Sequence, residues 1–233
     1  MGFDMFKNLM ILTMIIITTQ VSFASEFNFP GNEKQNQIDK IGYNIINKNR
    51  ITNRVIFTYD KNHKKTLLKT EKNLRSRNIV LYKNDFSHIE DENDLAAFIS
   101  NELVYVLRSY EGPWNGNMSI AKTKLSPKKF ETYSDKVAVD ILVNAGYNPA
   151  ILIIYLNKTY PQKSSDRLSK HNLTSKRMAR VYEYILLKYP NYLSDKTIIN
   201  NKYYQNFLLT SIHNRKLAEQ QVRYHYNWEP EYE

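Results

Sequence analysis

The chain has 233 residues, contains no cysteine and carries 33 Lys and Arg residues against 23 Asp and Glu residues, a formal net charge of +10. The absence of cysteine excludes a fold that depends on disulfides, and the length suits one domain with a full hydrophobic core. Because the basic residues form no single stripe, the charge alone does not indicate nucleic-acid binding.

The N-terminal segment 1–24 has the layout of a secretory signal peptide. Lys7 precedes an apolar run over residues 9–17, and the segment Ser22-Phe23-Ala24, with small residues at 22 and 24, follows. The run is about ten residues long, shorter than the roughly 20 that a membrane-spanning helix needs. We therefore expect cleavage after residue 24 and a single exported domain over 25–233, in the periplasm or outside the cell. An uncleaved anchor is the alternative.

Local patterns predict an α+β fold dominated by helices. Residues 32–50 are expected to form a helix, and the β-like runs 54–59 and 78–82 predict a small sheet. The apolar face of the first helix consists of Ile38, Ile41, Ile45 and Ile46. The next helix is expected from 92 to about 110, with Asp91 or Asn93 as its N-cap and Gly112-Pro113 as its stop.

The C-terminal half is expected to be helical throughout. Ser126 and Pro127 are typical of an N-cap and a first helical turn, and this helix should end at Gly146. Three further helices are predicted over 149–156, 173–188 and about 195–222, with Pro190 between the last two. The aromatic tail 224–232 is expected to be a docked or frayed end.

One of these helices carries a motif with chemical meaning. Residues 92–110 read Glu-Asn-Asp-Leu-Ala-Ala-Phe-Ile-Ser-Asn-Glu-Leu-Val-Tyr-Val-Leu-Arg-Ser-Tyr. This segment resembles the E-x-E-L-A-A-x-x-x-H-E-x-x-H-V helix of the zinc metallopeptidases that include HtpX and the CAAX prenyl endopeptidases. In that family both histidines bind zinc and the glutamate is the general base. The resemblance puts the histidine positions at Asn101 and Tyr105 and the general base at Glu102.

A second segment matches the same family in the expected order. Residues 130–149, Phe-Glu-Thr-Tyr-Ser-Asp-Lys-Val-Ala-Val-Asp-Ile-Leu-Val-Asn-Ala-Gly-Tyr-Asn-Pro, resemble the family's E-x-x-A-D helix and its A-G-Y-D-P turn. The resemblance implies that Glu131 stands at the third zinc-ligand position. It also implies that Asp135 stands where a carboxylate supports a ligating histidine. The spacing of four places both side chains on one helix face.

A third segment, 168–177, resembles the S-T-H-P-x-x-x-x-R sequence of envelope members, in which the histidine can approach the zinc site. His171 and Arg177 match this pattern, whereas Asn172 stands in place of the proline. The resemblance covers about 79–180 and implies a mainly helical, zincin-like metallopeptidase domain with a small sheet.

The substitutions predict an inactive site. Asparagine is a poor zinc ligand, and tyrosine must lose a proton of pKa about 10 before its oxygen binds a metal well. Asn101 and Tyr105 therefore remove two of three protein ligands. Glu102 would then face bulk water of pKa near 15.7, against about 7 for zinc-bound water. No cofactor is predicted.

Three functions follow as hypotheses. The first is a pseudopeptidase that binds polypeptide or envelope proteins without cutting them. The second is an active metalloendopeptidase with rewired zinc ligands, namely Glu131, His171 and either Glu102 or His88. The third is a basic protein that binds the envelope surface on a relic scaffold, with peripheral membrane contact. Nucleic acid is not an expected partner, and the sequence says nothing of an oligomer.

The resemblance also predicts a cluster of side chains that takes the place of the metal. If the scaffold is retained, six residues should converge: Asn101, Glu102, Tyr105, Glu131, Asp135 and His171. Two carboxylates in a partly dry cleft either raise one pKa or recruit a cation, and His171 is the expected cation. The amide of Asn101 should donate to Asp135, and the hydroxyl of Tyr105 should donate to Glu131.

Overall fold

The computed structural model describes residues 32–63, 77–107, 125–163 and 165–230. The predicted signal peptide lies outside the described residues, as do the end of the second expected helix beyond 107 and its Gly112-Pro113 stop. The described part is mostly helical, with one two-stranded sheet. The predicted α+β fold class is thereby confirmed.

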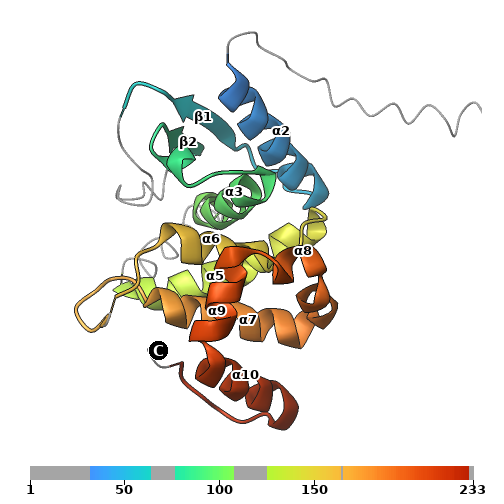
Figure 1. Cartoon of the computed structure of the whole chain (residues 1–233). Helices are drawn as coiled ribbons and strands as arrows, with labels where there is room; N and C mark the ends of the chain where they lie inside the picture. The colour runs from blue at the N-terminus through green and yellow to red at the C-terminus, as the bar shows by residue number, and fades with distance from the viewer. Residues whose placement is uncertain (1–31, 64–76, 108–124, 164, 231–233) are drawn as a thin grey trace, which may run out of the picture.

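Helix α2 (Glu33–Lys48) covers a sheet formed by β1 (Ile56–Asp60) and β2 (Asn78–Tyr82) at one end of the molecule (Figure 1). The two strands run parallel, with Phe57 opposite Ile79. Gly42 lets the helix approach the sheet closely, because a Cβ atom at this position would lie 2.6 Å from the Phe57 ring.

Helix α3 (Glu92–Leu107) occupies the centre of the fold. It contacts α2, β2, α5 and α6, and a helix surrounded in this way must be apolar on most of its faces. The Asp91 carboxylate accepts a hydrogen bond from the Asp94 N–H at 2.9 Å, which confirms Asp91 as a cap. Asn101 and Glu102 are buried on this helix among apolar neighbours.

Helices α5 (Pro127–Asn144) and α6 (Ile151–Thr159) pack against α3. Ser126 stands at the N-cap of α5 as predicted, but its side chain makes no capping hydrogen bond. After α5 the chain turns through Gly146, whose φ of 87° belongs to the left-handed region that favours glycine. Helix α6 begins and ends later than predicted.

Helix α7 (Thr174–Lys188) lies against α5, α6 and α10 and matches the predicted range within one residue. The 3₁₀ helices η1 and η3 cover Asp85–Ser87 and Pro190–Ser194. No helix within the described ranges is long and apolar enough to cross a membrane.

The single helix predicted over about 195–222 is wrong. The chain forms three helices there: α8 (Lys196–Ile199), α9 (Lys202–Thr210) and α10 (Ile212–Tyr224). At the first break the Asn201 side chain accepts the backbone N–H groups of Tyr203 and Tyr204. At the second, the Ser211 hydroxyl donates to the Phe207 carbonyl. Such local hydrogen bonds compete with a continuous helix.

The described part of the aromatic tail after α10, residues 225–230, is docked. Trp228 is buried, and the Arg180 guanidinium lies 4.6 Å from the centre of its ring. The same guanidinium donates to the Trp228 carbonyl at 3.0 Å. The tail is therefore held against α7, at the end of the molecule opposite the sheet (Figure 1).

Candidate functional site

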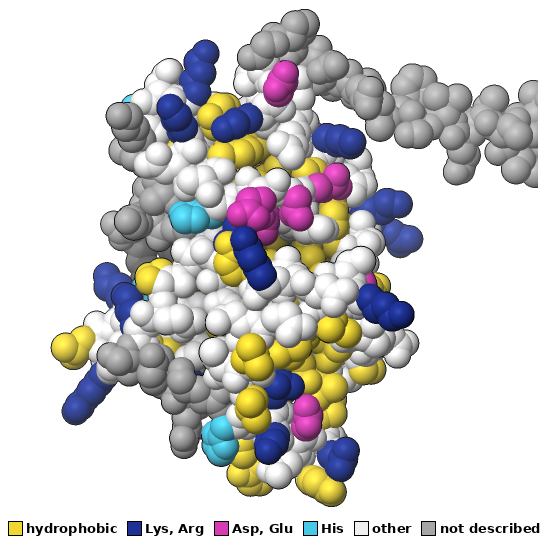
Figure 2. Space-filling model, viewed as in Figure 1, with side chains coloured by type: hydrophobic (Ala, Val, Ile, Leu, Met, Phe, Trp, Pro, Cys, Tyr) yellow, Lys and Arg dark blue, Asp and Glu magenta, His cyan; other side chains and the backbone are white. Residues whose placement is uncertain are grey.

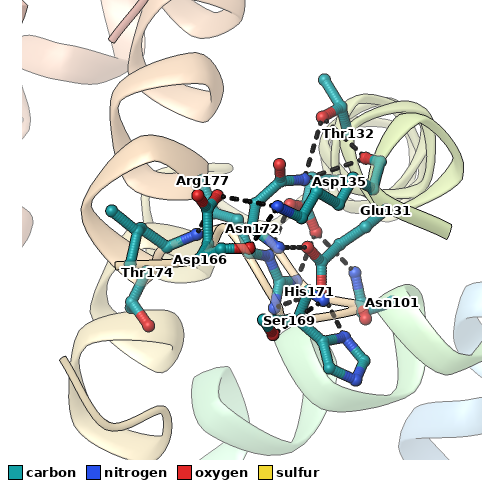
Figure 3. A network of polar contacts seen from close by, with 12 residues as sticks. Asn101, Glu131, Thr132, Asp135, Asp166, Ser169, His171, Asn172, Thr174 and Arg177 are labelled. Atoms are coloured by element: carbon teal, nitrogen blue, oxygen red, sulfur yellow. Dashed lines mark hydrogen bonds and ion pairs between the residues drawn. The ribbon is translucent and has the colours of Figure 1, made fainter. Parts of the chain in front are cut away.

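The predicted site residues come from α3, α5, α7 and the loop between α6 and α7. Figure 3 shows Asn101 of α3, Glu131 and Asp135 of α5, and Arg177 of α7 pointing toward one another, with His171 of the loop beside them. The three carboxylates of Glu102, Glu131 and Asp135 are each 5% exposed or less. The structure thus brings together residues that are far apart in the sequence.

Asp135 is held by two residues that the sequence analysis singled out. The Arg177 guanidinium donates to both of its carboxylate oxygens, from Nε at 2.8 Å and from Nη2 at 2.7 Å. The Asn101 amide donates to Oδ1 at 3.0 Å, which confirms the predicted contact. Burial raises the pKa of Asp135, whereas Arg177 and Asn101 act in the opposite direction.

Glu131 is engaged at both carboxylate oxygens. Nδ1 of His171 lies 3.1 Å from Oε1, and the backbone N–H of Asn172 donates to Oε2 at 2.8 Å. Nη1 of Arg177 lies 3.4 Å from Oε1. Burial on its own would raise the pKa of Glu131, but Arg177 and the two hydrogen bonds together lower the pKa below its ordinary value of 4.5.

Tyr105, on α3, lies near the charged groups of the cluster. Its ring meets the ring of Phe130 edge to face, with the centroids 4.9 Å apart. Burial raises the pKa of the Tyr105 phenol well above 10, and the nearby carboxylates, Glu102 first, add to this effect against Arg177. Tyr105 therefore stays protonated at neutral pH. Donation of its hydroxyl to Glu131 stays a prediction.

The positive charge of the cluster belongs chiefly to Arg177. The sequence analysis expected His171 to balance the carboxylates, and that expectation needs correction. The Arg177 side chain is 4% exposed and contacts two carboxylates, whereas the His171 side chain is 70% exposed and contacts one. A guanidinium stays charged at any ordinary pH, so the charge balance does not depend on the protonation of a histidine.

Two residues of the cluster were not identified from the sequence as part of it. Tyr160, next to the end of α6, lies under Arg177, with the guanidinium 4.7 Å from its ring centre. Asn172 was noted only as a replacement for proline. Its backbone N–H donates to Glu131, a hydrogen bond that proline cannot make. The replacement of a proline by a residue with an N–H was therefore the sequence feature that could have identified Asn172. Nothing local in the sequence distinguished Tyr160 from the other tyrosines.

The residues present do not fit the zinc site that the resemblance implies. Position 101 offers an amide whose nitrogen is bonded to Asp135, and position 105 offers a protonated phenol. Both oxygens of Glu131 already accept from protein groups. In the described ranges no three His, Asp or Glu side chains form a group that could hold a metal ion, so none joins His88 to Glu131 and His171.

No family model, curated protein or solved structure matches the chain. The part of the chain that the structure describes is an α+β protein with a buried cluster, between α3, α5 and α7, in which one arginine contacts two carboxylates.

Proposed function

We propose that this chain is an exported, degenerate member of the HtpX and CAAX prenyl endopeptidase family, with a zincin-like fold, that binds polypeptide in the cell envelope without cleaving it. Three ordered motif matches support the family, and the substitutions at Asn101 and Tyr105 support the loss of catalysis. The retained site residues adjoin one another although they come from different helices.

The contacts of Arg177 carry the proposal. In a zinc peptidase of this design, a dication offsets the charge of the ligand carboxylate. Here the guanidinium of Arg177 contacts both Glu131 and Asp135, so the buried carboxylates have a permanent counter-charge within the chain. Glu102 has no metal-polarised water to deprotonate, because the ligand positions beside it are an amide and a protonated phenol.

Zinc analysis and an activity assay on the purified protein test this proposal. We expect substoichiometric zinc at neutral pH and no cleavage of an unfolded polypeptide such as reduced, carboxymethylated lactalbumin, together with saturable binding of that polypeptide. Because two ligands hold zinc weakly, Asn101→His alone should restore little affinity, whereas Asn101→His with Tyr105→His should bind more.

The matched control is Asn206→His with Thr210→His, which places two histidines at the same spacing on α9. This helix contributes no residue to the cluster described above. Tight, stoichiometric zinc in the unmodified protein, or cleavage that a chelator abolishes, would refute the pseudopeptidase and favour the rewired enzyme. Absence of polypeptide binding would refute the binding function.

A further inference from the structure

The loop between α6 and α7 presents a leucine to solvent. Leu168 is 100% exposed, the highest value among the large hydrophobic residues described. Leu125, just before α5, is 83% exposed. Burial of a leucine side chain in an apolar phase is favourable, so two exposed leucines on adjoining segments can contribute to such a contact.

Hydrogen bonds hold the loop that carries Leu168. Nζ of Lys128 donates to the Asp166 carbonyl at 2.5 Å and lies 3.4 Å from its carboxylate. The amide of Asn172 donates to the Lys128 carbonyl at 2.9 Å. Both ends of the segment 166–172 are thus fastened to the first turn of α5, the same turn that follows Leu125. The chain segments that carry the two exposed leucines therefore adjoin each other at the start of α5.

The tip is flanked by positive charge. Arg167 and Lys170 are exposed on either side of Leu168, and Lys129 is exposed on α5. The one carboxylate in the loop segment, Asp166, is already paired with Lys128. In Figure 2 a hydrophobic side chain projects at the left edge, where the loop lies in Figure 1, with Lys and Arg side chains on both sides.

We propose that this tip, defined by Leu168 and Leu125 with Arg167, Lys170 and Lys129, docks onto an anionic lipid surface. A leucine flanked by long cationic side chains suits the boundary between headgroups and acyl chains. The leucine can enter the apolar region while the basic groups stay at the phosphates. A projecting tip fits a deformable bilayer better than it fits a peptide partner, because peptides are commonly bound in grooves. The surface lies outside the proposed polypeptide-binding function, and either can fail alone.

The absence of cysteine gives this proposal a local test. In the full chain, Leu168→Cys carries an environment-sensitive nitrobenzoxadiazole label at a unique site. The matched control is Leu187→Cys, because Leu187 is 60% exposed on α7 and lies about 20 Å along that helix from its start. With vesicles of equimolar phosphatidylglycerol and phosphatidylcholine, we expect a blue shift and brighter emission at position 168 only. Vesicles of phosphatidylcholine alone should give neither.

Charge variants complete the experiment. Arg167→Gln with Lys170→Gln should weaken the vesicle affinity of the labelled protein by roughly 25-fold, since each basic residue near an anionic surface contributes about fivefold. An unchanged signal at position 168, or equal changes at 168 and 187, would overturn the proposal. A third result would also overturn it: vesicle binding that soluble polyphosphate abolishes, with the emission of the label at 168 still that of an aqueous environment. The partner would then be an anionic polymer.

Discussion

At the scale of single residues, Arg177 decides the chemistry of the site. A buried carboxylate pair without a cation would shift its pKa values upward until one group was neutral. With Arg177 in place, the pKa of Glu131 is lowered, whereas burial still keeps the pKa of Asp135 above its ordinary value. The same guanidinium stacks on Tyr160, which also shields it from water. Arg177 thereby stabilises a cluster that would otherwise repel itself.

Replacing Arg177 should therefore be severe. Arg177→Met leaves Glu131 and Asp135 buried without their counter-charge, and we expect a loss of about 3 to 5 kcal/mol in the free energy of unfolding. Urea denaturation at pH 7 measures it. The control Lys188→Met, on the same helix, breaks an ion pair with Asp140 in which the two side chains are 46% and 30% exposed, and should cost no more than about 1 kcal/mol.

The pH dependence of that variant has a defined sign. In the unmodified protein the lowered pKa of Glu131 contributes stability above its ordinary value of 4.5, and this is lost as the pH falls through the lower folded value. Without Arg177, burial dominates and the carboxylates favour protonation. The stability gap between Arg177→Met and the unmodified protein should therefore narrow from pH 7 to pH 4. A constant gap would contradict a charge-based role.

Asn172 offers a test based on one backbone hydrogen. Asn172→Pro introduces the proline of the motif that this segment resembles, but it removes the backbone N–H that donates to Glu131. A lost hydrogen bond to a buried charged group costs about 2 kcal/mol, so thermal unfolding should show that destabilisation. Asn172→Ala keeps the N–H and loses only the side-chain bonds to the Lys128 carbonyl and the Thr132 hydroxyl, and should cost about 1 kcal/mol or less. Equal effects would exclude the N–H as the important group.

At the scale of elements, close packing between α2 and β1 depends on the absence of a side chain. We expect Gly42→Ala to destabilise the protein by about 1 to 2 kcal/mol, because the clash with the Phe57 ring exceeds the gain in helix propensity. Calorimetry measures the change. Asn47→Ala, at an exposed position of the same helix, should be neutral or slightly stabilising. A stabilising Gly42→Ala would show that the ring yields without cost.

The C-terminal elements show how packing overrides a continuous pattern. Helix α9 packs on α6, and α10 packs on α7. One straight helix over the same residues could not follow both partners. The breaks fall at Asn201 and Ser211, whose side chains bond to nearby backbone groups. Both residue types are common at helix ends, but asparagine and serine also occur elsewhere in this chain within helices, so residue type alone did not locate the breaks.

At the scale of the whole molecule, one loop connects the two functional proposals. His171 and Asn172 contact Glu131 in the buried cluster, while Leu168 projects from the same loop into solvent. The proposed lipid-docking tip is therefore close in sequence to the site residues but separate from them in chemistry. The sheet lies at one end and the docked aromatic tail at the other (Figure 1).

The sequence by itself determined most of the helices and the shared face of Glu131 and Asp135, and it gave Asp91 as one of two possible caps. These features depend on periodicity and on contacts within a few residues. The Asn101 contact followed only from the family resemblance, because its partner lies on another helix.

Only the tertiary structure decided the parallel pairing of the strands, the division of the C-terminal helix and the identity of the buried cation. Arg177 and His171 are both basic residues in one short segment, and their sequence positions do not rank them. The packing of α7 against α5 buries Arg177 between two carboxylates and leaves His171 at the surface. Burial strengthens the electrostatic interactions of a charge, because the dielectric constant is low in the protein interior. Only packing between distant segments creates such an interior.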